Sequence, residues 1–553
     1  MRLLGIVFLL PLVSAAPLVH RDTIHGAVAS ETAECSEIGT QMLQKGGNAV
    51  DSVLASAICV GLMGGHHCGI GGGGFLLLRK PGGEKLFYDF REMAPAASNE
   101  TMFVGKSPTA STIGGLSVGI PGQLRGFEEI HREHGKLPWA DLFAPTIRLA
   151  REGFRITGEV ATTLAGPSSA FMLNDTRWKS VYAPKGVFLR ENETTTFPSL
   201  ANTLQRIAEE GAEAFYSGDI AKSIVDAVQA SGGVLTLEDL RKYTPKRREP
   251  LQTTYRGMGV WAGSPPSSGA ILLSDLNILE GYKLERNHLT MHRVVEAMKF
   301  GFGQRTALGD PDFVANVTEI VHQFLDKDVA RKIREHITDN ATHGSDWYNP
   351  KKFEIASDTG TSQLSAADSI GWAASMTTTI NLLWGSRVMT DTGIILNDQM
   401  DDFSTPGKSN AFGLVDTPAN YIAPGKRPLS SISTALVERD GELLMVTGAA
   451  GGSRIITATL QNIINVVDLN MTLAEAVANP RVHDQISPNN TFLEEKFDKG
   501  TAEYLASLGH NITFTPPLSA VHAVLRVPTT QENRAGFDAA ADPRKVGSGS
   551  SVI

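Results

Sequence analysis

Small and apolar residues recur at helical spacing in several segments of the first 310 residues. Residues 26–60 alternate between apolar and polar stretches, which suits a strand followed by a helix over Asn48 to Val60. The continuous apolar run Phe75 to Leu78 is typical of a buried strand. Residues 120–230 are rich in helical patterns. We predict helices there and beyond over Leu204–Glu210, Ile220–Ala230 and 288–308.

The pattern changes in the last third of the chain. Residues 325–357 are polar with few apolar positions, and we predict a surface loop there. Thr472 and Glu475 form a capping box that opens a helix through Ala478. From Thr361 onward short β-like runs appear, at Ser375–Leu383, Leu443–Val446 and Val521–Val527.

The first residues follow the order of a secretory signal peptide. Met1-Arg2 is a positive start, Leu3 to Val13 is apolar, and small residues follow. We assign residues 1–15 to this signal, cut after Ala15 or Ala16. A membrane anchor is the alternative, but this apolar run is shorter than the roughly 20 residues that span a bilayer. We expect a secreted, vacuolar or wall-associated protein without a stable membrane anchor.

Composition narrows the class of protein. Of 553 residues, 42% are hydrophobic, enough for a large core, which excludes a mostly disordered chain. The net charge of −9 argues against a nucleic-acid partner, which normally requires a basic stripe. The 55 glycines cluster in short runs without a repeat period, so collagen and solenoid architectures are excluded.

Asparagines and cysteines fit the secretory route. Three cysteines leave at least one unpaired. Cys35 and Cys59 flank an apolar helical pattern, and a bridge between them suits an oxidising compartment. Cys68 is then the odd thiol, either a nucleophile or, as we favour, a buried inert side chain. Eight asparagines lie in glycosylation tripeptides: Asn99, Asn174, Asn192, Asn316, Asn340, Asn470, Asn489 and Asn511.

Three short motifs do not support the chemistry they suggest. The glycine run 69–74 lacks the Lys-Ser/Thr ending of a phosphate loop and precedes a strand, so close backbone packing is the better interpretation. His288 and His292 have metal-ligand spacing, but no Glu follows His288 and no matching ligand cluster exists, which favours a structural pair. Residues 115–119 match a nucleophile elbow without its strand and helix. We therefore expect no metal and no organic cofactor.

A series of polar motifs in the last 200 residues carries more information. The first is Asp358 to Ser365, which contains Gly360-Thr361. The others are Thr377-Thr378-Thr379-Ile380-Asn381, the acidic run Asn397 to Phe403, Pro428-Leu429-Ser430-Ser431 and Gly448 to Ser453.

These motifs together resemble the γ-glutamyltransferase family, and the resemblance covers nearly the whole chain after the signal. Matching pieces in the first half are Gly46 to Asp51, the run 69–74, Phe90-Arg91-Glu92-x-Ala94-Pro95 and Gly309-Asp310-Pro311. The resemblance implies an α+β fold of the N-terminal-nucleophile hydrolase class, an αββα sandwich of two stacked mixed β-sheets flanked by helices. It also implies autocleavage between Gly360 and Thr361. The products would be a large subunit, residues 16–360, and a small catalytic subunit, residues 361–553, intertwined in one heterodimeric fold.

The chemistry of an N-terminal threonine is consistent with this resemblance. A threonine hydroxyl is a weak nucleophile unless a base accepts its proton. An N-terminal threonine carries that base itself, as an α-amino group with a pKa near 8. The amine exists only after the bond before Thr361 is broken, and attack of the Thr361 hydroxyl on the preceding carbonyl would break it.

The resemblance also assigns the substrate-binding residues. A γ-glutamyl group presents an α-carboxylate and an α-ammonium, which require opposite charges. Arg91, Ser430 and Ser431 would hold the carboxylate, and Asp402 with Asn381 and Gln399 the ammonium. In some relatives the position of Gln399 is a carboxylate. Gly451 and Gly452 would donate N–H groups to the oxyanion, and Thr379 would orient Thr361.

The sequence therefore predicts a γ-glutamyltransferase that acts on glutathione and related γ-glutamyl compounds, with water, an amino acid or a dipeptide as acceptor. An acylase of the same fold is one alternative, but it has no use for both Asp402 and Arg91. An uncleaved binding protein is another, against which the presence of Thr361 and Thr379 counts. The Cys35–Cys59 bridge occurs in animal relatives, whereas their second bridge is absent. The preferred acceptor, the ratio of hydrolysis to transfer and the oligomeric state stay open.

Overall fold

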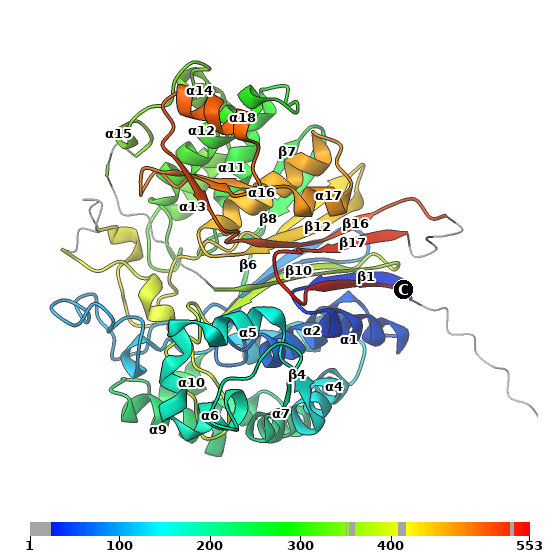
Figure 1. Cartoon of the computed structure of the whole chain (residues 1–553), viewed down its shortest axis with the longest axis vertical. Coiled ribbons are helices and arrows are strands. Elements are labelled where there is room, and N and C mark those ends of the chain that lie inside the picture. The colour runs from blue at the N-terminus through cyan, green and yellow to red at the C-terminus, as the bar shows by residue number, and fades with distance from the viewer. Residues whose placement is uncertain (1–23, 350, 353–359, 408–415, 531–532, 534–535) are drawn as a thin grey trace, which may run out of the picture.

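The computed structural model describes residues 24–349, 351–352, 360–407, 416–530, 533 and 536–553. The expected signal peptide lies outside these described residues. Two β-sheets are stacked in the middle of the molecule, and helices cover both outer faces (Figure 1). The predicted αββα sandwich is confirmed.

The first sheet has seven strands in the order β18-β1-β9-β10-β2-β3-β6. Their bounds are β18 Gly549–Val552, β1 Gly26–Ser30, β9 Ser362–Asp368, β10 Ala373–Thr379, β2 Gly73–Arg79, β3 Lys85–Asp89 and β6 Lys246–Arg248. The second sheet has six strands, β17-β16-β12-β11-β8-β7. These are β17 Phe537–Ala541, β16 Ala520–Arg526, β12 Glu442–Ala450, β11 Ala435–Arg439, β8 Met258–Ala262 and β7 Leu251–Tyr255.

Every ladder in these two sheets is antiparallel. The expectation of mixed sheets was therefore wrong. Neighbouring strands such as β9 and β10 are joined by a tight turn, which reverses the chain and produces an antiparallel pair. A parallel pair occurs in the small sheet of β13 (Val482–His483), β14 (Thr491–Glu494) and β15 (Ile512–Thr515). Strands β4 (Phe154–Arg155) and β5 (Thr194–Thr195) form another small antiparallel pair.

Both sheets contain strands from both sides of the Gly360–Thr361 bond. In the first sheet they interleave, because β1 lies between β18 and β9, and in the second sheet β11 pairs with β8. Where the sheets meet, the Ser365 hydroxyl donates to the His522 carbonyl and the Ser375 hydroxyl to the Thr447 carbonyl, each at 2.8 Å. Small polar residues therefore join the two layers.

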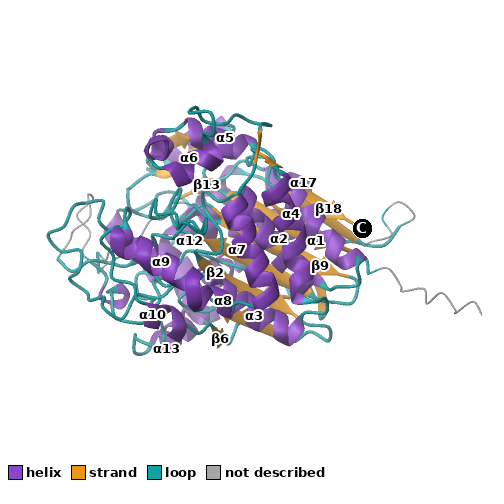
Figure 2. Cartoon of the chain, turned by 90° about the horizontal axis from the view of Figure 1, so that it is seen from below, coloured by secondary structure: helices purple, strands orange, loops and turns teal. Residues whose placement is uncertain are grey.

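Ten helices cover the first sheet, on the lower side in Figure 1 and facing the viewer in Figure 2. Their bounds are α1 Ala33–Gln44, α2 Ala49–Met63, α3 Gln123–His134, α4 Trp139–Glu152, α5 Gly158–Ala165, α6 Thr176–Tyr182, α7 Pro198–Glu210, α8 Glu213–Tyr216, α9 Gly218–Ala230 and α10 Leu237–Lys242. The predicted helices over 48–60, 204–210 and 220–230 are confirmed as α2, α7 and α9. The segment 26–60 contains one helix more than expected, because α1 precedes α2.

The other helices lie on the second sheet. Their bounds are α11 Gly269–Glu280, α12 His288–Arg305, α13 Val317–Leu325, α14 Lys327–His336, α15 Ser345–Tyr348, α16 Arg454–Val467, α17 Leu473–Ala478 and α18 Lys499–Ser507. The predicted helix over 288–308 is α12, and α17 begins with the predicted capping box of Thr472 and Glu475. No helix of the described part is both long and apolar enough to cross a membrane.

The predicted loop over 325–357 was wrong where α14 and the short α15 form, and residues 350 and 353–357 of that prediction lie outside the described residues. Asp326 caps this helix by accepting a hydrogen bond from the Asp328 amide. Ala330 is buried in the core, and Ile333 packs against the same core. The remaining residues of α14 are mostly charged and face solvent. A helix with so few apolar residues has the same polar composition as a surface loop, and its sequence does not distinguish the two.

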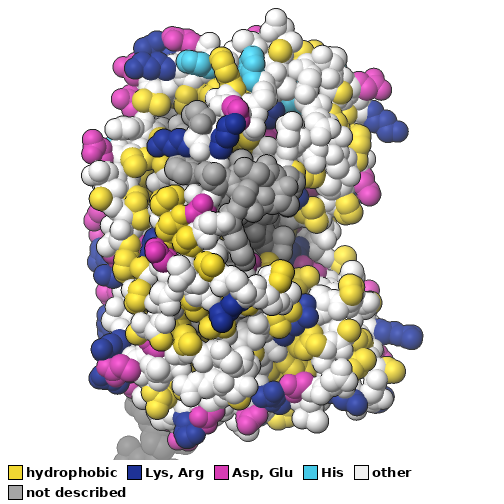
Figure 3. All heavy atoms as spheres, turned by 90° about the vertical axis from the view of Figure 1, so that its left-hand side faces the viewer, with side chains coloured by type: hydrophobic (Ala, Val, Ile, Leu, Met, Phe, Trp, Pro, Cys, Tyr) yellow, Lys and Arg dark blue, Asp and Glu magenta, His cyan; other side chains and the backbone are white. Residues whose placement is uncertain are grey.

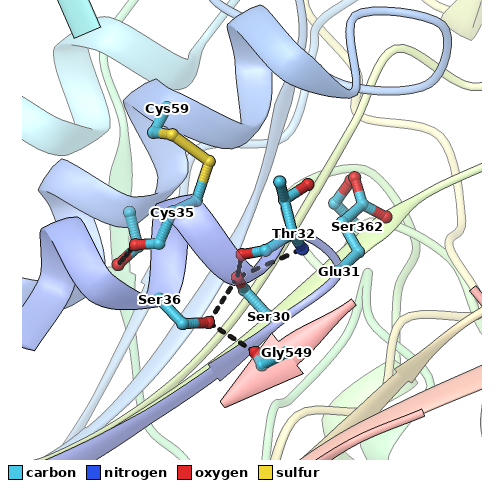
Figure 4. The surroundings of a disulfide bond; sticks show 9 residues. Ser30, Glu31, Thr32, Cys35, Ser36, Cys59, Ser362 and Gly549 are labelled. Carbon is cyan, nitrogen blue, oxygen red and sulfur yellow. Dashed lines mark hydrogen bonds between the residues drawn. A yellow bond between two sulfur atoms is a disulfide. The ribbon is translucent and has the colours of Figure 1, made fainter. Parts of the chain in front are cut away.

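The predicted Cys35–Cys59 disulfide is present and joins α1 to α2 (Figure 4). Cys68 is free and buried, and burial raises the pKa of its thiol well above the usual value. A thiol held neutral in this way is a poor nucleophile, as we expected for an inert side chain.

Candidate active site

Thr361 immediately precedes β9 and is 3% exposed. Its hydroxyl contacts the carbonyl oxygen of Gly360, and the Thr379 hydroxyl donates to that same oxygen at 3.1 Å. Gly360 has a φ of 113°, and a Cβ there would collide with the Asn381 carbonyl. The nucleophile candidate therefore lies against the bond whose cleavage would free its amine, and Thr379 holds the carbonyl of that bond rather than Thr361 itself.

Asn381 connects this threonine pair to the acidic run. Its amide N–H donates to the Thr379 hydroxyl at 2.8 Å, and its Nδ2 donates to the Asp398 carbonyl at 3.1 Å. Its Oδ1 is buried without a hydrogen-bond partner among the described residues. A buried amide oxygen without a donor is available to a ligand that brings one.

Arg91, which we expected to hold the substrate carboxylate, and Asp402, which we expected to hold the ammonium beside it, form an ion pair with each other. Arg91 is 1% exposed and Asp402 is 6% exposed. Gln399 Nε2 donates to the same Asp402 carboxylate at 2.6 Å, which leaves the Gln399 Oε1 unpartnered among the described atoms. The structure brings these three predicted residues together although Arg91 comes from the loop after β3.

Ser430 and Ser431 are buried and held by residues that the sequence analysis did not identify. The Ser430 hydroxyl accepts from the Ile432 amide at 3.2 Å, and the Ser431 hydroxyl accepts from Arg305 Nη2 at 3.0 Å. Ser268 donates to the Ser430 carbonyl and accepts from Arg305 Nε. Each serine oxygen accepts a bond and still has its O–H proton to donate, which suits a carboxylate ligand. Arg305 is the last residue of α12 and lies within the predicted helix 288–308, but its partners come from distant segments.

Gly451 and Gly452 connect the end of β12 to α16. Their φ angles are 124° and 61°, values that favour glycine. The two carbonyl groups accept bonds from the amides of Arg454 and Ile455, at 3.3 and 3.0 Å. This places their N–H groups at the N-terminal end of α16, where the helix dipole favours an anion.

Two further carboxyl groups of this region were not assigned a role. Glu92 belongs to the same motif as Arg91 and is buried. Its carboxylate oxygens have no hydrogen-bond partner among the described residues, and Oε2 lies 3.6 Å from Arg91 Nη1. Burial raises its pKa to about 8, against the opposing effect of Arg91. Burial also raises the pKa of Asp398 well above its usual value, although Asp398 Oδ1 accepts the Leu382 amide at 3.0 Å.

Two of the motifs set aside in the sequence, the glycine run 69–74 and the pair His288 and His292, have defined contacts in the structure. A Cβ at Gly71 or Gly72 would collide with the Ile395 or Thr379 carbonyl, so this glycine run allows close packing. His288 bonds Thr501, whereas His292 bonds His510, and the two histidines do not converge.

One face of the molecule shows its surface charges in Figure 3. Lys and Arg side chains are interspersed with Asp and Glu on the face in Figure 3. All eight asparagines of the glycosylation tripeptides are exposed.

Two stacked sheets, with a threonine at the start of an inner strand, define the N-terminal-nucleophile hydrolase class. The family model described as Gamma-glutamyltranspeptidase matches residues 35–552. The chain therefore belongs to the γ-glutamyltranspeptidase family.

Relatives are similar over nearly the full length. The chain is 43% identical to the glutathione hydrolase proenzyme of Arthroderma benhamiae, covering 97% of this chain and 94% of that protein. It is 35% identical to the glutathione hydrolase proenzyme of Escherichia coli, covering 96% and 93%.

Two solved structures are similar as well. A cephalosporin acylase from Bacillus halodurans is 26% identical, with a TM-score of 0.83 and 99% of both chains covered. The γ-glutamyltranspeptidase of Helicobacter pylori is 33% identical, with a TM-score of 0.54, covering 56% of this chain and 91% of that one.

Proposed function

We propose that this protein is a γ-glutamyltransferase that also hydrolyses glutathione. The observation that carries the proposal is the buried Arg91–Asp402 pair, connected through Gln399 and Asn381 to the Thr361 region. The names of relatives such as the Arthroderma benhamiae glutathione hydrolase proenzyme support it.

Maturation begins with attack of the Thr361 hydroxyl on the Gly360 carbonyl carbon. The Oγ–C bond forms, the C–N bond breaks, and the proton of the hydroxyl passes to the leaving amide nitrogen. Water then hydrolyses the ester, giving a carboxylate at Gly360 and a free α-amine at Thr361. Thr379 supports the first step, because its hydroxyl donates to the oxygen on which negative charge develops.

In the mature enzyme the Thr361 amine accepts the hydroxyl proton as Oγ attacks the γ-carbonyl of the substrate. The N–H groups of Gly451 and Gly452 stabilise the oxyanion. The leaving amine takes the proton and departs, which leaves a γ-glutamyl ester on Thr361. Water resolves it to glutamate, or an amino acid or dipeptide accepts the group. This chemistry requires protein groups only.

The paired charges account for the choice of acyl group. A γ-glutamyl group brings its own carboxylate and ammonium, so both Arg91 and Asp402 regain an opposite charge when it separates them. An uncharged acyl group of similar size would break the pair without replacing either partner, and unpaired buried charges are costly. The site therefore favours γ-glutamyl compounds over the substrates of an acylase.

The mature protein is proposed to be a heterodimer of residues 16–360 and 361–553, secreted to the cell exterior, wall or vacuole. The interleaved strands support a heterodimer that stays together after cleavage. The exposed sequons support glycosylation on that route, because a glycan requires a surface asparagine.

The test combines N-terminal sequencing with substrate comparison. Purified protein should yield a second N-terminus at Thr361, and it should release glutamate from glutathione. A glutaryl amide, which lacks only the α-ammonium, serves as the matched substrate. Equal turnover of the glutaryl and γ-glutamyl amides would favour an acylase, and a single uncleaved chain without activity would favour a binding protein.

A further inference from the structure

Arg454 lies beside the oxyanion glycines and is a cation without an ion-pair partner in the part of the chain that the structure describes. It is the first residue of α16, and its amide donates to the Gly451 carbonyl. The side chain is partly buried, and its guanidinium makes no ion pair or hydrogen bond with any described residue. The guanidinium carbon lies 5.4 Å from the centroid of the Phe492 ring, and the nearby charge of Arg454 helps to lower the pKa of His483, after the larger effect of burial. Burial lowers the pKa of Arg454, and no carboxylate opposes that effect.

The side chain lines a small hollow between α16, the β13–β14 pair and residues 515–519. The hollow offers about 20 Å³, room for a group about the size of a water molecule or of one carboxylate oxygen. Its other charged wall residues are already paired, since Arg481 bonds Asp542 and Glu494 bonds Arg544, each at 2.6 Å. Only the charge of Arg454 remains unmatched among these walls.

The hollow adjoins the oxyanion turn. A Cβ on Gly451 would approach the Ser519 Cα to 2.7 Å, and Ser519 also lines the hollow. A group leaving the acyl carbon above the Gly451 amide therefore starts next to this wall. An extended dipeptide spans about 7 Å. Arg454 follows Gly451 by three residues, and its amide donates to the Gly451 carbonyl at 3.3 Å, so the two residues lie within one turn of each other. The free carboxylate of a dipeptide is thus within the range of the guanidinium.

We propose that Arg454 binds the C-terminal carboxylate of the dipeptide leaving group and of a dipeptide acceptor. The inference rests on the proposed γ-glutamyl transfer and specifies its acceptor class: peptides with a free carboxylate. Arginine suits the role because its planar donors match a carboxylate in two-point geometry. The competing explanation is structural, in which Arg454 merely stacks on Phe492.

The experiment measures transfer from γ-glutamyl-p-nitroanilide to glycylglycine and to glycylglycine amide, which lacks the carboxylate. Arg454→Gln should raise the KM for glycylglycine about tenfold or more, as expected for one charge-assisted bond, and leave the KM for the amide unchanged. Arg454→Lys should recover part of the loss. Phe492→Leu removes the ring but keeps the cation, and should change the KM for glycylglycine less than Arg454→Gln does.

Arg526→Gln is the matched control, because Arg526 stacks on Phe537 at the far end of β16. Arg526→Gln should leave the KM unchanged for both glycylglycine and glycylglycine amide. Equal losses for both acceptors in Arg454→Gln would overturn the proposal in favour of the structural explanation. If that variant does not fold, the wild-type enzyme still decides: similar KM values for glycylglycine and its amide would refute a carboxylate site. A wild-type protein that releases no p-nitroaniline would instead refute the proposed function.

Discussion

Replacing Asp402 by asparagine keeps the shape of the side chain and removes its charge. The change leaves the Arg91 guanidinium, which is 1% exposed, without its Asp402 carboxylate partner. In the substrate complex the α-ammonium loses its partner as well. Removing one member of a buried charge pair costs about 2–5 kcal/mol, which corresponds to a loss of about 30-fold to several thousand-fold in kcat/KM.

The effect on folding should be smaller than the effect on catalysis. Breaking a buried pair usually costs about 3–5 kcal/mol of unfolding free energy. Glu92 lies 3.6 Å from Arg91, and the charge of Asp402 contributes to the raised pKa of Glu92. Once Asp402 is neutral, Glu92 ionises more readily and partly replaces the lost partner. We therefore expect Asp402→Asn to lose less than 3 kcal/mol in chemical unfolding near neutral pH.

Hydrolysis of γ-glutamyl-p-nitroanilide gives kcat/KM, and a denaturing gel reports autocleavage, which should be normal because no glutamyl ligand takes part. Asp401→Asn is the matched control: Asp401 precedes Asp402 but is partly exposed and accepts the Ser111 hydroxyl at 2.5 Å. It should change activity no more than a few-fold. Near-normal activity of Asp402→Asn, or an equal loss in both variants, would show that Asp402 does not bind the ammonium.

Four other changes test separate parts of the argument. Thr361→Ala should remain one chain and be inactive; cleavage at the same bond in that variant would exclude the intramolecular mechanism. The pH profile of kcat/KM should rise through one ionisation near the reference pKa of about 7.7–8.0 for the Thr361 amine, and it should decline at high pH. A profile that rises only near the pKa of a carboxylic acid, with no further rise above neutral pH, would indicate a side-chain base instead. Glu92 has its pKa raised from 4.5 to about 8 in the folded protein, so the folded state holds the extra proton in that window and unfolding free energy should fall as pH rises through it. Glu92→Gln should remove this slope in denaturant titrations at pH 5, 6.5 and 8, and an unchanged slope would assign it to other groups. The double variant Cys35→Ser and Cys59→Ser removes a disulfide between residues 24 positions apart, and it should lower the unfolding free energy by about 3–4 kcal/mol. A loss below 1 kcal/mol would mean that the disulfide constrains the unfolded chain very little.

Much of the local structure was predictable because it depends on neighbouring residues. The helical spacing over 48–60 and the capping box at Thr472 act within one or two turns, and both helices formed where expected. The sequence analysis missed helix α14 because only Ala330 of this helix is fully buried and only a few of its neighbours are partly buried. A stripe of that width is recognised only when the core it packs against is known.

The order and composition of the motifs also determined the family and the residues to examine, because each motif is a contiguous run of chain. The sequence alone shows that Thr361 follows Gly360. It also shows that Arg91 and Asp402, which carry opposite charges, belong to separate motifs. Only the tertiary structure decided that Arg91 pairs with Asp402, 311 positions away, and that Arg305 holds Ser431. The same holds for the antiparallel ladders and for the hollow beside Arg454. Such contacts depend on how distant segments close into two stacked sheets, and no local periodicity encodes that closure.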